Sequence, residues 1–407
     1  MIPSSMQDGN TLRIALLGNM NNNHFALARY LRDEGFNCEL LLLANEQDHF
    51  NPKCDTNNLE FMPWVKRVTW GAQHQLLSIS AKVIQADVDK YDILIGCDLT
   101  PAFLYKAGYS LDIMIPYGWD IWEATRLRIA APHYILKFLF AIYLQRKGLS
   151  RVKTFHSTSD SNVYGRRIRN FNPNAHFWNF GIPIVYHKQY SDQSIGLGAH
   201  WFNDFQEIRR NVDFMLVAHG RHVWGSANNL SVKGNDILIE GWSIFLDRNP
   251  MTKSKLVLIE YGEDVVKSKR YIAELGIQDS VCWFPKMYRK DLMPGLLMAD
   301  LVAAEFIHSW IGGGVIYEAL VAGKPLLMHS VEHKKPTRSK DLYPIYNAST
   351  AEQIADRLQD CIDEPERGRK MGIAGHKWYQ ENIVEKAIAK YTEYFEHRAK
   401  ALGKTAR

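Results

Sequence analysis

The hydrophobic pattern of the first half of the chain alternates between short apolar runs and segments with helical spacing. The run "LRIALLGN" (12–19) predicts a strand that breaks at Gly18, and "HFALARYLRDEGF" (24–36) predicts a helix. The run "NCELLLLAN" (37–45) predicts the next strand. A strand, a helix and a strand in this order indicate a βαβ unit, and therefore a parallel sheet. Further strands are predicted at 91–97, 111–118 and 152–158.

The second half of the chain repeats this alternation. Residues 182–211 show no clear period and separate the two series, while 385–402 predicts a charged amphipathic helix. The fold class that this pattern predicts is α/β, with two Rossmann-like doubly wound domains that face a central cleft at the carboxyl ends of their sheets. In the second series, strands are predicted at 212–220, 254–262, 280–286, 300–306 and 324–330, and helices at 235–249 and 268–276.

The length of 407 residues also favours two domains. We expect a C-terminal segment that packs back toward the N-terminal domain. The predicted divisions are an N-terminal domain at 1–190, a linker region at 191–211, a C-terminal domain at 212–375 and the terminal helical segment at 376–407.

Composition excludes several classes of protein. The net charge of +5 lacks the large excess of a nucleic-acid-binding protein, and 46% apolar residues are enough for sizeable cores. Five scattered cysteines without metal-like spacing indicate reduced thiols. The N-terminus "MIPSSMQDGN" lacks a signal-peptide pattern, and no apolar run is long enough to span a bilayer. We therefore expect a cytoplasmic protein.

The stretch "HSWIGGGVIYEALVAGKP" (308–325) predicts a glycine-rich entrance to a helix. Gly312, Gly313 and Gly314 let the backbone approach a ligand, and the helix N-terminus offers free N–H groups to a phosphate. Glu318 lies one turn further on, where its carboxylate can accept hydrogen bonds from two vicinal hydroxyls, such as those of a ribose. The alternative is that the glycines only allow tight packing and that Glu318 is solvated.

A second candidate site follows the strand at 212–220. Arg221 comes directly after that strand, and Lys233 precedes the next predicted helix. Two cations at the carboxyl edge of a parallel sheet suit a diphosphate, which Arg binds as a fork and Lys as a point charge. The alternative is two ordinary surface cations.

The first strand-to-helix turn of the N-terminal domain, "GNMNNNH" (18–24), is polar and poor in glycine. It lacks the G-x-G-x-x-G of a nicotinamide site, which argues against a dehydrogenase. Gly18 and Asn19 are candidate donor-binding residues there, and His24 is a candidate catalytic residue or a structural histidine. In "PYGWD" (116–120), Tyr117 and Asp120 are candidate catalytic residues at the end of another strand, or Asp120 only caps a helix.

In this order, the motifs resemble the GT-B glycosyltransferases of family four over residues 12–400. The resemblance implies that Arg221 and Lys233 hold the diphosphate of a nucleotide-sugar donor and that Glu318 binds its ribose. The motifs that carry it are Gly220-Arg221, Lys233-Gly234-Asn235-Asp236, "EALVAGKP" (318–325), "YGWD" (117–120) and "NFGIP" (179–183).

Two positions depart from the family pattern. Relatives carry a sugar-binding Glu eight residues before the ribose-binding one, where this chain has Trp310, and a His where it has Tyr117. An indole can stack on a sugar ring but cannot accept hydrogen bonds from hydroxyls. Trp310 therefore either contacts the sugar or packs between helix and sheet. In the second case Glu305 is the next candidate for the missing carboxylate.

The resemblance implies a hexosyltransferase that uses a UDP- or GDP-linked sugar and a glycan or lipid-linked acceptor, retains the anomeric configuration and needs no metal or other cofactor. Arg221 and Lys233 would neutralise the departing diphosphate. An inverting reaction would instead need a base, for which His24 and Asp120 are the candidates. The alternatives are a nucleotide-sugar epimerase or hydrolase on the same fold and a catalytically silent nucleotide-sugar-binding subunit.

The segment 126–153 combines basic residues with aromatic and aliphatic ones. This pattern suits an anionic membrane surface and predicts a peripheral location on the inner face of the cell membrane. The alternative is a core helix with a solvated basic end.

Overall fold

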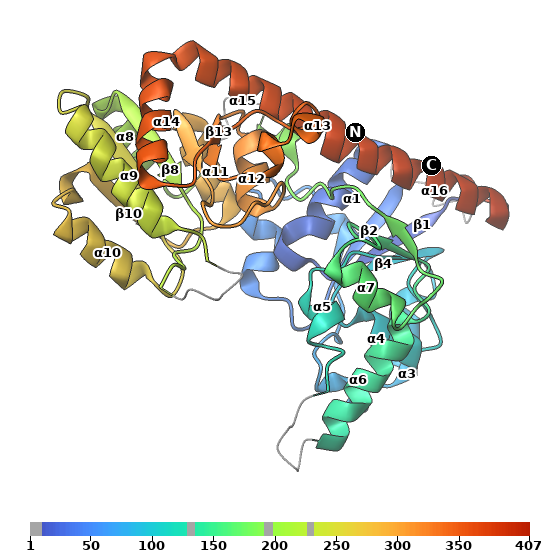
Figure 1. Cartoon of the computed structure of the whole chain (residues 1–407). Coiled ribbons are helices and arrows are strands. Elements are labelled where there is room, and N and C mark those ends of the chain that lie inside the picture. Colours follow the sequence, from blue (N-terminus) through green and yellow to red (C-terminus); the bar gives the residue numbers. More distant parts are fainter. Residues whose placement is uncertain (1–9, 128–134, 191–197, 226–231) are drawn as a thin grey trace. The chain divides into compact units, whose positions relative to one another are not determined.

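The computed structural model describes residues 10–127, 135–190, 198–225 and 232–407 and divides the chain into two compact units (Figure 1). Unit 1 combines Met1–Tyr186 with Asn382–Arg407, and unit 2 is His187–Glu381. Each unit is built on one parallel sheet with helices, so the predicted fold class of two Rossmann-like domains is confirmed. That the domains face a central cleft stays a prediction.

The sheet of unit 1 has the strand order β3-β2-β1-β4-β5-β6-β7. The order reverses between β1 and β4, where Leu17 lies opposite Gly96. Ligands of doubly wound sheets bind at such a switch point, beyond the carboxyl ends of the strands. The strands are β1 (Arg13–Leu17), β2 (Asn37–Leu42), β3 (Val65–Arg67), β4 (Ile93–Gly96), β5 (Ile113–Met114), β6 (Thr154–His156) and β7 (His176–Trp178).

The helices of unit 1 cover this sheet and include the C-terminal helix of the chain. On that helix, α16, Phe395 packs edge-on against Phe36 at 5.1 Å between ring centroids, and the Tyr391 hydroxyl lies 3.0 Å from Nδ1 of His156. The described helices are α1 (Asn23–Asp33), α2 (Gln75–Ser78), α3 (Ala81–Val88), α4 (Thr100–Lys106), α5 (Trp119–Trp122), α6 (Ile135–Leu149), α7 (Val163–Arg169) and α16 (Lys386–Leu402).

The sheet of unit 2 repeats this topology with the strand order β10-β9-β8-β11-β12-β13. Its switch point lies between β8 and β11, where Ala218 is opposite Ala303. All five residues of β8 are buried, as expected for a central strand covered on both faces. The strands are β8 (Phe214–Ala218), β9 (Ser254–Glu260), β10 (Val281–Pro285), β11 (Leu301–Ala303), β12 (Leu326–Met328) and β13 (Tyr346–Asn347).

The core of unit 2 forms where its helices pack on this sheet. Trp242 and Phe245 of α9 are fully buried and stack near Phe214 of β8. The described helices are α8 (Phe202–Asn211), α9 (Asn235–Arg248), α10 (Val265–Glu274), α11 (Arg289–Met298), α12 (Gly314–Val321), α13 (Pro336–Ser339), α14 (Ala351–Asp363) and α15 (Pro365–Tyr379).

The structure differs from the predicted organisation between the two series. The chain enters unit 2 at His187, and Phe202–Asn211 of the predicted linker region form the helix α8. This helix buries Phe205, which stacks on Phe284 at 4.5 Å, and half-buries Phe202 and Ile208 on either side of it, whereas its other seven residues are polar. Residues 191–197 of the linker region lie outside the described residues. Through the described part of the chain, no helix is long and apolar enough to cross a membrane.

Candidate active site

The glycine-rich entrance of α12 lies at the carboxyl edge of the unit 2 sheet. Gly313 caps the helix with φ +137°, a conformation that side chains with a Cβ rarely adopt. A Cβ at Gly312 would lie 2.6 Å from the Tyr317 hydroxyl, whereas one at Gly314 would meet nothing within 4 Å. Two glycines therefore shape the entrance and the third leaves space in front of the helix N-terminus.

Glu318 is buried one turn inside α12, between Arg289 and His219. Its Oε1 accepts a hydrogen bond from Nε of Arg289 at 2.8 Å, and its Oε2 lies 2.9 Å from Nε2 of His219. Burial acts to raise the pKa of Glu318, but the Arg289 charge and the His219 hydrogen bond outweigh it and lower the pKa to about 2. The carboxylate is therefore ionised at neutral pH, and each oxygen retains a lone pair for a ligand hydroxyl.

Lys233 directly precedes Gly234, the N-cap of α9, and both its backbone N–H and its carbonyl are hydrogen-bonded. Its N–H donates to the carbonyl of Val223 at 2.8 Å, and its own carbonyl accepts from the N–H of Phe306 at 2.8 Å. The ammonium donates to Oε2 of Glu305 at 2.6 Å. Glu305 follows β11, beside the switch point. The predicted diphosphate cation and the predicted spare carboxylate thus form one ion pair.

Arg221 is exposed on the loop that joins β8 to α9. Asp264 anchors this loop, because its Oδ2 accepts the N–H groups of Trp224 and Gly225 at 2.7 and 2.8 Å. Residues 226–231 of the loop lie outside the described residues. The side chains of Arg221 and Lys233 therefore both extend from anchored backbone, at the same edge of the sheet.

Trp310 lies on the loop between β11 and α12 and is 49% exposed. The loop is fixed around it, since Ser309 Oγ accepts the Val331 N–H at 2.7 Å and the Ile311 carbonyl accepts the Tyr343 hydroxyl at 3.0 Å. The exposure contradicts the alternative that Trp310 packs between helix and sheet.

Asn19 and His24 organise the first turn of unit 1, and both are buried. The Asn19 side chain donates to Asn22 Oδ1 at 2.8 Å and accepts from the Phe25 N–H at 2.9 Å. Nδ1 of His24 lies 2.7 Å from the carbonyl oxygen of Gly18, and burial lowers the pKa of His24 to about 4. His24 is therefore neutral at physiological pH, and its hydrogen bond to Gly18 stabilises the turn that follows β1.

Asp120 is fully buried and holds the turn before α5. Its carboxylate accepts the N–H groups of Gly118 at 3.0 Å, Tyr117 at 3.2 Å and Asp98 at 3.3 Å. Burial, and then the charge of Asp98, raise the pKa of Asp120 to about 7. The alternative that Asp120 caps the helix is wrong, because Gly118 is the N-cap of α5 and Asp120 lies in its first turn. The carboxylate of Asp120 instead fixes the backbone N–H groups before the helix.

Two further carboxyl groups, those of Asp98 and Glu46, lie at the carboxyl edge of the unit 1 sheet and were not predicted from the sequence. Asp98 follows β4 and accepts a hydrogen bond from the Tyr117 hydroxyl, and burial raises its pKa to about 6. Glu46 follows β2 and accepts the Asn19 N–H at 2.5 Å, and burial raises its pKa to about 7. An acidic residue just after a buried strand was the available signal for both.

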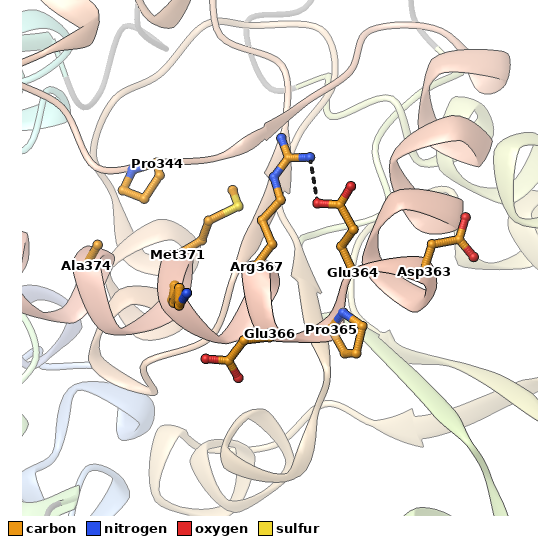
Figure 2. Close-up of a pocket in the computed structure, with 9 residues that line it drawn as sticks. Pro344, Asp363, Glu364, Pro365, Glu366, Arg367, Met371 and Ala374 are labelled. Atoms are coloured by element: carbon orange, nitrogen blue, oxygen red, sulfur yellow. Dashed lines mark hydrogen bonds and ion pairs between the residues drawn. The ribbon is translucent and has the colours of Figure 1, made fainter.

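A separate shallow groove of about 670 Å³ lies at the junction of α14 and α15. Figure 2 shows Arg367 in this groove, directed at Glu364. None of the candidate residues lines it, so we assign it no part in the site. Across the described residues, no group of His, Cys, Asp and Glu is placed to hold a metal ion. The lining residues are Pro344, Asp363, Glu364, Pro365, Glu366, Arg367, Lys370, Met371 and Ala374.

The family of unit 2 follows from comparison with known proteins. Residues 223–378, which carry Lys233, Glu305 and Glu318, match the family model described as glycosyl transferases group 1. This segment is a group 1 glycosyltransferase domain. The predicted resemblance to group 1 glycosyltransferases and the predicted enzyme class, a glycosyltransferase, are thereby confirmed. No curated protein matches the chain significantly in sequence.

The fold of the whole chain is similar to solved structures. HepE from Anabaena, in complex with UDP, is 17% identical with a TM-score of 0.58, over 95% of this chain and 100% of that one. A glycosyltransferase from Rickettsia africae is 14% identical with a TM-score of 0.61, over 96% and 99% of the two chains. Sucrose-phosphate synthase from Thermosynechococcus elongatus is 13% identical with a TM-score of 0.57, over 96% and 100%. This likeness supports the predicted GT-B fold class.

Two partners of Glu318 in unit 2, His219 and Arg289, were not predicted from the sequence. His219 is the first residue after the central strand β8, a position that doubly wound folds use for ligands, so a signal was present. Arg289 begins α11 and is distant from Glu318 in sequence, so no local pattern links them. Nδ1 of His219 is buried and has no hydrogen-bond partner among the described residues.

Proposed function

We propose that this chain transfers a hexosyl group from a UDP- or GDP-linked sugar to a glycan or lipid-linked acceptor, with retention of configuration and without a metal ion. The observation that carries the proposal is the ionised, buried Glu318 behind the open N-terminus of α12, with the Lys233–Glu305 pair at the same sheet edge. The UDP bound to HepE and the group 1 domain support the same class of donor.

Each part of the donor has a chemically matched group in unit 2. Glu318 would accept the two ribose hydroxyls, one on each oxygen, because Arg289 and His219 occupy only one lone pair of each. Arg221 and the N–H groups at the start of α12 would bind the diphosphate. The exposed indole of Trp310 would stack on the sugar.

Lys233 would change partner when the donor binds. In the free enzyme its ammonium is neutralised by Glu305 at 2.6 Å. A diphosphate carries more negative charge than one carboxylate and would compete for this ammonium. Glu305 would then be free to accept a hydrogen bond from a sugar hydroxyl, which compensates for Trp310 at the position of the usual carboxylate.

In the transfer step, the bond between the anomeric carbon and the diphosphate oxygen breaks, and a bond to the acceptor hydroxyl oxygen forms. The acceptor proton leaves with the diphosphate. Arg221 and Lys233 would stabilise the charge that develops on the departing group, the main electrostatic task of such a reaction. Two cations and a helix N-terminus can perform this task without a divalent ion.

On the side of unit 1, we propose that Tyr117 and Asp98 serve the acceptor. Asp98 is only partly buried, whereas Asp120 and His24 are enclosed and engaged with backbone groups. We therefore propose that Asp120 and His24 position this edge, together with Gly18 and Asn19, rather than act as bases. A location at the inner face of the cell membrane, through residues within 126–153, is part of the same proposal; residues 128–134 of this segment lie outside the described residues.

The deciding experiment follows nucleoside diphosphate release from a panel of UDP- and GDP-sugars, with and without sugar and lipid-linked acceptors and with a chelator. Release that depends on an acceptor and survives chelation supports the proposal. Release without an acceptor indicates a hydrolase, a changed sugar without release indicates an epimerase, and binding alone indicates a silent subunit. The anomeric configuration of the product, read by NMR, tests retention.

A further inference from the structure

Helix α6 presents apolar side chains both to the core and to solvent. Ala141, Ile142 and Leu144 are buried on one side. On the other side, Leu136 is 79% exposed and Tyr143 is 49% exposed, with Leu139 between them at helical spacing. A helix on the surface of a soluble domain normally shows polar residues there. The outward face of α6 therefore exposes three large apolar side chains where polar ones are expected.

The exposed apolar face continues onto α5 and α7. Arg146, one turn beyond Tyr143 on α6, donates to the Thr125 carbonyl from Nε at 3.0 Å and from Nη2 at 2.7 Å. Arg167 of α7 donates to Thr125 Oγ1 at 3.0 Å and lies 5.3 Å from the ring centroid of Trp122. These contacts join the three helices into one surface.

Aromatic side chains extend this surface beyond α6. Trp119 and Trp122 of α5 and Tyr164 of α7 are all substantially exposed. A Cβ at Gly118 would lie 3.0 Å from the Tyr164 hydroxyl, which places Tyr164 beside the start of α5. We define the interfacial surface as Trp119, Trp122, Leu136, Leu139, Tyr143 and Tyr164.

The charge of this region is strongly positive. Residues 119–169 contain ten Lys and Arg but only three Asp and Glu, a net charge of +7, whereas the whole chain carries +5. One of the three acids, Asp120, is fully buried, and another, Asp160, is paired with Arg169. On α6 itself Lys137 and Lys147 are exposed. Cations thus surround the apolar side chains, and little exposed negative charge offsets them.

We propose that the interfacial surface lies against an anionic lipid bilayer, with the tryptophans and tyrosines at the level of the headgroups and Lys137 and Lys147 against anionic lipids. Exposed Trp and Tyr suit the interface because their rings are apolar and their N–H or O–H groups stay hydrated. Leucines of a helix in the interface plane enter the acyl boundary. The inference rests on the proposed function in that it deepens the membrane location of the transferase.

The test is cosedimentation of the full chain with phosphatidylcholine vesicles, with and without phosphatidylglycerol, at low and high salt and without donor. We expect binding to the anionic vesicles that weakens at high salt. Leu136→Ser should weaken it about tenfold, and Lys137→Gln with Lys147→Gln about 25-fold, at about fivefold for each lost charge. All three substituted side chains are exposed, so both variants should fold as the parent chain does.

Matched control variants distinguish binding through this surface from nonspecific binding to vesicles. Val266→Ser removes an apolar side chain of unit 2 that is 70% exposed, and Lys82→Gln removes an exposed charge on α3. Both should bind vesicles as the parent chain does. No binding to anionic vesicles at low salt, or equal losses in controls and variants, overturns the proposal. A dimer in light scattering that Leu136→Ser abolishes, without vesicle binding, also overturns it, because a second copy then covers the surface. Nucleotide release without vesicles should be unchanged in Leu136→Ser, so failure here is distinct from failure of the transferase assignment.

Discussion

The carboxyl edges of the two sheets have the same topology but opposite electrostatics. In unit 2, Glu318 contacts Arg289 and His219, Glu305 contacts Lys233, and the pKa of Glu318 falls to about 2. In unit 1, the hydrogen bonds described for Asp98 and Asp120 come from backbone N–H groups and the Tyr117 hydroxyl, and burial raises their pKa values to about 6 and 7. The two edges therefore differ in how they balance buried charge.

This difference assigns the two edges different chemistry, although the fold is shared. Cations that neutralise carboxylates in unit 2 can also neutralise a diphosphate, so this edge suits an anionic ligand. Carboxyl groups with pKa values near neutral in unit 1 can hold or release a proton, which suits a neutral ligand with hydroxyl groups. The charge pattern, rather than the sheet order, distinguishes the proposed donor edge from the proposed acceptor edge.

The largest effect is expected from breaking the Glu318 cluster. Arg289→Met leaves a buried carboxylate with only His219, which should cost about 3 kcal/mol or more of stability and abolish most UDP binding. The double variant Arg289→Met with Glu318→Leu removes both charges and should recover most of the stability without recovering UDP binding. Chemical denaturation and calorimetry measure the two quantities. Recovery of UDP binding in the double variant would show that Glu318 has no part in binding.

The Lys233–Glu305 pair should give the next largest effect. Loss of one charged partner of a phosphate costs about 1.5–3 kcal/mol, so Lys233→Ala should weaken UDP binding roughly 10- to 100-fold. It should also destabilise unit 2, because Glu305 is left buried and unpaired. Arg221→Ala is the matched control, which should weaken binding without loss of stability since Arg221 is exposed. Unchanged UDP affinity in both variants would remove the diphosphate assignment.

The pH dependence of stability should have opposite signs for the two edges. Asp98 and Asp120 have raised pKa values, so between about pH 4 and pH 7 the folded state binds more protons, and the free energy of unfolding falls as pH rises. Asp98→Asn removes one such group and lowers the pKa of Asp120. It should therefore reduce the loss of stability between pH 4 and pH 7 by about 1–2 kcal/mol. Glu318 has a lowered pKa, so its contribution is present above about pH 4.5 and is lost as pH falls toward about 2. A slope between pH 4 and 7 that Asp98→Asn leaves unchanged would contradict the picture of unit 1.

The sequence predicted the central elements of both sheets because they are buried on both faces. The apolar runs that form β1, β2, β8 and β9 predict strands and nothing else. The edge strands β3, β7 and β13 were missed, since they have only two or three residues and pair on one side. Helix α8 was missed because its 10 residues offer only three apolar positions, Phe202, Phe205 and Ile208.

In the site, too, local sequence patterns predict single residues but not contacts between distant parts of the chain. Lys233 and Glu318 could be predicted because glycines mark the turns that present them. Their partners could not be paired from the sequence, because a contact such as Arg289 with Glu318 depends on two helices that meet in the fold. Glu305 was predicted only as a substitute for the carboxylate missing at Trp310. The ion pair of Glu305 with Lys233 could not be predicted from the sequence motif.

Trp310 gives the smallest expected effect on stability and the sharpest separation of binding from turnover. Its indole is 49% exposed on a loop held by Ser309 and Ile311, so Trp310→Ala should change the free energy of unfolding by less than about 0.5 kcal/mol. UDP lacks the sugar, so its affinity should stay nearly constant, whereas turnover of the intact donor should fall or shift to another sugar. Trp310→Phe retains a stacking ring but not the N–H donor, and should keep most of the activity if stacking is the main contribution. If Trp310→Ala weakened UDP and the intact donor equally, the indole would have no separate contact with the sugar, and Glu305 would be the remaining candidate for that role.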